Sequence, residues 1–102
     1  MKVRNYREVK PETVKPGASL RWVIGEKEGA PNFIMRVAEL EPGASTPLHT
    51  HDYEHEVFVL AGHGVVQGEE GQVPLGEGDT VFIPPMEQHR FLNQGQVLFR
   101  FI

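Results

Sequence analysis

The sequence predicts a single all-β domain, a sandwich or barrel built from short strands. Its 102 residues are the length of one ordinary domain. Eleven glycines and eight prolines recur at short intervals and separate runs that are rich in Val, Ile, Phe, Leu and Thr, which is typical of short strands joined by tight turns. No longer run has the apolar period of a helix. Pro11 and Pro16 interrupt the polar segment that could otherwise have formed one.

The predicted strands follow one another along most of the chain. Residues 1–19 are polar and contain prolines, so we expect an extended N-terminal arm or edge strand there, followed by a β-barrel over residues 20–102. The strands expected within the barrel are 20–24, 33–40, 46–51, 54–61, 65–67, 72–74, 80–83, 89–93 and 97–102.

Composition excludes several classes of protein. Hydrophobic residues make up 39% and charged residues 24% of the chain, which indicates a globular domain. No window approaches the ~20 apolar residues of a membrane helix, so we expect no membrane partner. The formal net charge of -4 gives no basic surface for nucleic acid. The absence of cysteine excludes disulfides, thiol catalysis and Cys-ligated metals. No apolar stretch follows the charged N-terminus, so we expect a cytoplasmic protein.

Three of the five histidines, His49, His51 and His55, lie within seven residues. In a strand, His49 and His51 point to the same face with Cα atoms ~6.6 Å apart, and a short turn can bring His55 back toward them. Neutral imidazoles gathered without a cation would compete for too few hydrogen-bond partners, so this spacing predicts a metal site. His89 opens another strand after a Pro-Pro turn, whereas His63, between two glycines, is expected to be exposed.

Two motifs resemble those of the cupin superfamily of small β-barrels. The first runs from Gly43 through the pair His49-Thr-His51 to Gly62, and the second runs from Gly78 to Asn93. Together they cover residues 43–93, about half the chain. The resemblance implies a cupin-type double-stranded β-helix, or jelly-roll, barrel in a single domain. It also implies one divalent metal ion bound by His49, His51, His55 and His89.

The chain departs from the cupin motifs at two positions. Met86 stands where the second motif has glycine, so we expect a different backbone conformation in that turn. His55 stands where most cupins carry glutamate, and Glu56 is the alternative ligand. The six-residue count to Gly62 and the alternation of strand faces both favour His55. The site then resembles the four-histidine subgroup, which comprises small single-domain bacterial cupins that bind manganese.

Four imidazole ligands have chemical consequences. They leave a divalent ion its full positive charge, which makes it a stronger Lewis acid. On a metal that prefers six ligands, two positions stay open for water, dioxygen or a bidentate substrate. Imidazole suits several metals, so Fe²⁺, Ni²⁺, Cu²⁺ and Zn²⁺ fit as well, and only the resemblance favours Mn²⁺.

Strand alternation suggests the residues of a substrate pocket. Phe91, Phe99 and Phe101 are expected to face inward, where aromatic rings serve as core or as pocket walls. Arg36 is a charge within an apolar strand. It lies either on the exposed face or inside the barrel, where it would bind the carboxylate or enolate of an anionic substrate.

We expect a metal-dependent oxidoreductase, similar to a dioxygenase, that acts on a small organic molecule beside the metal. The alternatives are a metal-dependent lyase or isomerase acting on a sugar or keto acid, and a cupin that binds a small molecule without catalysis, because one fold serves many functions. Phe58 and Leu60 lie on a strand face that is not expected to line the barrel. An exposed apolar face of this kind predicts a homodimer.

Overall fold

The computed structural model describes all residues, 1–102, as an all-β domain, which confirms the predicted fold class. The strands are β1 (Glu12–Lys15), β2 (Ala18–Ile24), β3 (Met35–Leu40), β4 (His55–Ala61), β5 (Gly64–Gly68), β6 (Gly71–Leu75), β7 (Thr80–Ile83), β8 (Arg90–Leu92) and β9 (Phe99–Phe101). Two 3₁₀ turns, η1 (Tyr6–Glu8) and η2 (Glu26–Glu28), are the only helical elements. Neither is long or apolar enough to cross a membrane.

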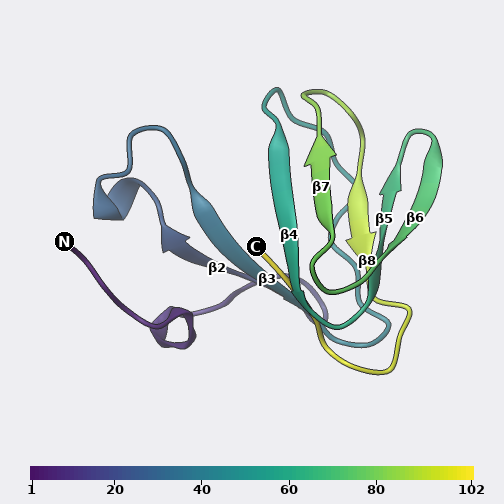
Figure 1. The fold of residues 1–102 in the computed structure, drawn as a ribbon, viewed down its shortest axis with the longest axis horizontal. Coiled ribbons are helices and arrows are strands. Elements are labelled where there is room, and N and C mark those ends of the chain that lie inside the picture. Colours follow the sequence, from purple (N-terminus) through teal and green to yellow (C-terminus); the bar gives the residue numbers. More distant parts are fainter.

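The strands form two antiparallel sheets. One sheet has the order β1-β2-β3-β9-β4-β7 and the other has the order β6-β5-β8. Strands β4 to β8 stand together as a barrel, and β2 and β3 extend away from it toward the N-terminus (Figure 1). The crossovers β3-β9-β4 bring the two ends of the chain into the same sheet, so the barrel depends on contacts between distant segments.

The core follows the alternation of the strands. In β4, Val57 and Val59 are buried, whereas Phe58 and Leu60 on the other face are 47% and 41% exposed. Twelve buried side chains pack between the sheets as one cluster. They are Ala18, Ala38, Leu40, Ala44, Val57, Val59, Val66, Leu75, Ile83, Phe91, Phe99 and Phe101.

The strand expected over residues 46–51 is not continuous. This segment runs beside β8 and forms only one isolated bridge, His49 with His89, while Ser45, just before it, forms another with Leu92. Pro47, near its centre, has no N–H to donate to a ladder. The predicted strand ends also differ, since β3 begins at Met35 rather than at residue 33 and β9 covers only Phe99–Phe101. The N-terminal segment contains β1, which pairs with β2 at the edge of the larger sheet.

Met86 lies in a turn with an unusual backbone conformation. It is the only residue other than glycine with a positive φ, +72°, so it adopts the left-handed conformation that glycine favours. Its backbone N–H donates a 2.7 Å hydrogen bond to the carbonyl of His51. This bond joins the turn to the histidine segment.

Candidate metal centre

Three imidazoles converge at one end of the barrel. His49 and His51 come from the segment beside β8, and His89 directly precedes β8. Reciprocal backbone hydrogen bonds of 3.2 and 3.0 Å join His49 to His89 and fix their separation. One ring nitrogen from each of the three histidines lies within 4.8 Å of the other two, a separation that one metal ion can bridge.

Hydrogen bonds fix the tautomer of each of these rings. The Nδ1 atoms of His49, His51 and His89 lie 2.7, 2.7 and 2.8 Å from the backbone carbonyls of Pro47, Tyr53 and Glu87. A carbonyl oxygen can only accept, so each Nδ1 carries the proton and each Nε2 keeps a free lone pair. This is the arrangement found around metal-bound histidines.

The Nε2 atom of His51 is the decisive observation on whether the site suits a metal. It is the only buried side-chain nitrogen or oxygen of the chain without a hydrogen-bond partner. A buried lone pair without a partner is costly, and a divalent cation would satisfy it. The donor set of neutral imidazoles fits Mn²⁺, Fe²⁺, Ni²⁺, Cu²⁺ or Zn²⁺.

His55, the first residue of β4, lies at the edge of this group. Its ring centroid is 4.3 Å from that of His51 and 5.5 Å from that of His89. Its Nδ1 and Nε2 atoms are 3.3 and 3.5 Å from Nη2 of Arg36. The structure therefore brings all four predicted histidines together, but only three share the tightest group. Glu56 is exposed on the opposite face of β4.

Burial favours the neutral form of two of these histidines, His55 and His89. Desolvation, and then the positive charge of Arg36 and the neighbouring histidines, lower the pKa of His55 to about 4. Desolvation also lowers the pKa of His89, and its hydrogen bond to the Glu87 carbonyl opposes part of this effect. Neutral rings are the form that binds a metal.

The other predicted pocket residues occupy two environments. Phe91, Phe99 and Phe101 are 4%, 0% and 7% exposed and pack on one another in the core, with ring centroids 4.5 and 5.0 Å apart. Their role as pocket walls stays a prediction. Arg36 is half-buried beside His55 rather than on the outer face of its sheet.

Two residues outside the cluster have clear structural environments. Asn93 is 1% exposed and donates hydrogen bonds of 2.8 Å to the carbonyls of Leu40 and Val97, so it ties β3 to the loop before β9 and does not contact His89. His63 is exposed, as the sequence predicts.

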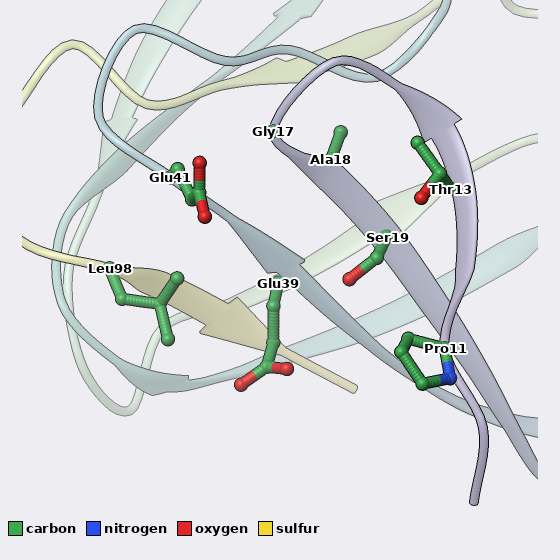
Figure 2. Close-up of a pocket in the computed structure, with 8 residues that line it drawn as sticks. All are labelled: Pro11, Thr13, Gly17, Ala18, Ser19, Glu39, Glu41 and Leu98. Carbon is green, nitrogen blue, oxygen red and sulfur yellow. The ribbon is translucent and has the colours of Figure 1, made fainter.

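A cavity of about 280 Å³ reaches the cluster at His89. The β5–β6 hairpin and β7 form its walls, which include Val66, Val73 and Val81. A second hollow, of about 310 Å³, lies beside the β1–β2 turn (Figure 2). It contains no histidine, and its Glu39 already pairs with Arg21 and Arg100.

Two aromatic residues beside the cluster were not predicted from the sequence. The Tyr53 ring stacks on that of His51, with centroids 4.1 Å apart and planes 7° from parallel. The Trp22 ring lies 5.1 Å from Cζ of Arg36. Tyr53 could have been predicted to lie at the site, because it lies between two predicted ligands in the sequence. Trp22 could not, because its position depends on the register between β2 and β3.

The fold and the histidines define a class of protein, a small antiparallel β-barrel with a candidate metal centre at one end. The sequence model of the cupin domain matches residues 36–102, about two thirds of the chain. The chain therefore belongs to the cupin family.

Several characterised structures and sequences are similar to this chain. The polyketide cyclase RemF from Streptomyces resistomycificus has a TM-score of 0.91 and 32% identity, covering 99% of this chain and 75% of that one. A predicted oxalate decarboxylase from Thermotoga maritima has a TM-score of 0.84 and 26% identity, covering 98% and 94%. Protein SchB from Streptomyces halstedii is 32% identical over 98 residues, which are 95% of this chain and 71% of that protein.

Proposed function

We propose that this cupin is a metal-dependent enzyme that promotes non-redox chemistry at the carbonyl group of a small molecule. His49, His51 and His89 would hold the divalent ion, with His55 as the fourth ligand. The observation that carries the proposal is the convergence of three imidazoles whose Nδ1 atoms are engaged by backbone carbonyls and whose ring nitrogens lie within 4.8 Å of one another. A bound ion of this kind supplies a Lewis acid for a carbonyl oxygen.

The surroundings of the cluster favour carbonyl chemistry. Arg36 lies beside His55 and places a positive charge where a substrate would develop a negative one. The cavity at His89 has the volume for a small organic molecule, and its walls combine apolar side chains with polar ones such as Gln72 and Glu87. RemF, a polyketide cyclase, is similar along the whole chain, and ring closure of a polyketide is a reaction at carbonyl groups.

Metal content is the first test. We expect elemental analysis of the protein, isolated without a metal-binding tag, to find about one divalent ion per chain. Manganese is the ion that the family resemblance favours. A metal-free protein that also fails to bind added Mn²⁺ or Zn²⁺ would contradict the proposal.

The reaction class is tested by exchanging the metal and removing oxygen. We expect the methyl protons of pyruvate to exchange with D₂O faster in the presence of the metal-loaded protein, as followed by proton NMR. The exchange should persist without oxygen and after replacement of the ion by redox-inert Zn²⁺. The His51→Ala variant, which lacks one of the proposed metal ligands, is the control and should not accelerate the exchange.

The oxygen-dependent reaction that the sequence analysis expects needs the same histidines and stays a prediction. It would be favoured over carbonyl chemistry if turnover required oxygen and ended with Zn²⁺. Oxygen uptake, measured with the Mn- and Fe-loaded protein and diketone compounds, tests it directly.

A further inference from the structure

Arg36 is a half-buried cation without an acidic partner. It takes part in none of the ion pairs of the chain. Its only hydrogen-bond partner is the imidazole of His55, a side chain that carries no negative charge. Burying a charge is costly unless it is paired, so this position favours an anion supplied from outside the chain.

The opposite face of the same sheet provides a comparison. Arg21 and Arg100 are also partly buried there, but both pair with the carboxylate of Glu39. The chain thus neutralises two of the three arginines of this sheet and leaves the one beside the histidines unpaired. The five N–H groups of a guanidinium fit a carboxylate or an enolate, and only Nη2 of Arg36 is engaged, by the His55 ring.

Two exposed aromatic rings lie near this cation. Trp22 is the cross-strand partner of Arg36 and is 45% exposed, although its indole N–H is held by a 3.1 Å hydrogen bond to Oε2 of Glu12. Tyr53 is 53% exposed, and its ring is held by stacking on His51. Its ring centroid is also 5.7 Å from that of His55, the histidine that contacts Arg36. Both rings are therefore positioned and still accessible.

We propose that Arg36, Trp22 and Tyr53 form the recognition site for a planar, conjugated organic anion, whose carboxylate, enolate or phenolate oxygen binds Arg36. Offset stacking against the rings of Trp22 and Tyr53 orients the flat part of the molecule, and the charged oxygen is directed toward the histidine cluster. This inference rests on the proposed function, because it names the substrate class of the same site. In this site, Arg36 selects ligands by their charge, and the two aromatic residues select them by their shape.

The test compares two ligands that differ in charge and share their shape. The probes are trans-cinnamate and its neutral amide, cinnamamide, neither of which is a strong chelator. Binding is measured by calorimetry with the metal-loaded protein and again after removal of the metal. Trp22 is the only tryptophan, so quenching of its fluorescence reports whether the ligand lies at this site.

We expect the wild-type protein to bind cinnamate at least about tenfold more tightly than cinnamamide, which is the size of effect expected of one charge-assisted hydrogen-bonded pair. Arg36→Gln should lose this preference and retain its metal content. Arg100→Gln is the matched control, because it removes a cation from the opposite face of the same sheet and should keep the preference. Trp22→Leu should weaken the binding of both ligands by a similar factor.

Three results would overturn the inference. They are equal affinity of the wild-type protein for the two probes, an equal loss of preference in Arg100→Gln, and quenching of Trp22 by neither probe. If circular dichroism shows that Arg36→Gln is unfolded, Arg36→Lys carries the test, since it keeps the charge without the planar fork and should bind cinnamate more weakly than the wild type.

The metal proposal and this inference can fail separately. One bound metal per chain with no preference for cinnamate would overturn only the recognition site. A preference for cinnamate that persists in a protein unable to bind Mn²⁺ or Zn²⁺ would overturn only the metal proposal.

Discussion

At the scale of single residues, three backbone carbonyls position the imidazoles of the candidate metal centre. They orient each ring and leave its Nε2 atom free. The histidines can therefore be tested one at a time with little change to the barrel.

Substitution of the histidines should separate ligands from neighbours. We expect His51→Ala to lose the metal, because it removes the one buried Nε2 atom without a partner, and His55→Ala to lose it as the proposed fourth ligand. Glu56→Gln should keep the metal, because Glu56 lies on the opposite face of β4. His63→Ala is the control and should leave the metal content unchanged. Elemental analysis of the purified variants checks all four, and metal loss in Glu56→Gln would contradict the ligand assignment.

The backbone at Met86 stores strain that glycine would relieve. A left-handed conformation costs a residue with a side chain about 1–2 kcal/mol, and glycine gives back part of this through its greater freedom in the unfolded chain. We therefore expect Met86→Gly to raise the free energy of unfolding by ~0.5–1 kcal/mol, as measured by urea denaturation. Gln88→Gly, in the same loop but without a positive φ, should lower it.

At the scale of elements, the two sheets approach closely where β5 crosses β9. A Cβ atom added at Gly64 would overlap the ring of Phe99, which is fully buried. We expect Gly64→Ala to lower the free energy of unfolding by about 1–3 kcal/mol, the typical cost of overpacking a core. Phe99→Leu in the same chain should restore part of the loss. Gly25→Ala is the control, because its added methyl group would meet nothing closer than 3.8 Å.

The outer face of β4 carries the remaining prediction about assembly. Phe58 and Leu60 are 47% and 41% exposed on that face, and we propose that it packs against a second copy of the chain. Analytical ultracentrifugation at micromolar concentration should give the mass of a dimer. Leu60→Glu should shift the mass toward the monomer, and a monomeric wild-type protein would contradict the proposal.

At the scale of the whole molecule, the neutral histidines couple stability to pH. His55 titrates at about 4 in the folded protein and near the ordinary value of 6.5 when unfolded. The unfolded chain therefore binds more protons between these values, and stability falls as the pH falls through this window. We expect the unfolding temperature of the metal-free protein to drop between pH 6.5 and about 4. The His55→Gln variant should drop less, and an equal drop would contradict the assignment.

Much of the site was predictable from local spacing, and the reason is physical. Alternation along β4 separates His55, Val57 and Val59 from Glu56 without any knowledge of the neighbouring strands. The same rule turned Phe99 and Phe101 inward, where the structure buries them. The rule was less useful over residues 46–51, because Pro47 cannot donate to a ladder and only the bridge of His49 with His89 remains.

The sequence by itself determined the all-β class, the cupin motifs and the set of histidines, because each depends on residue types and spacings within a short stretch of chain. The tertiary structure alone decided that Arg36 lies beside His55 and has no acidic partner. It also decided that Trp22 lies against that arginine. These placements follow from the register of β2 on β3 and from the crossover that sets β9 between β3 and β4. Such long-range pairings are fixed by the packing of the whole barrel, which no local pattern records.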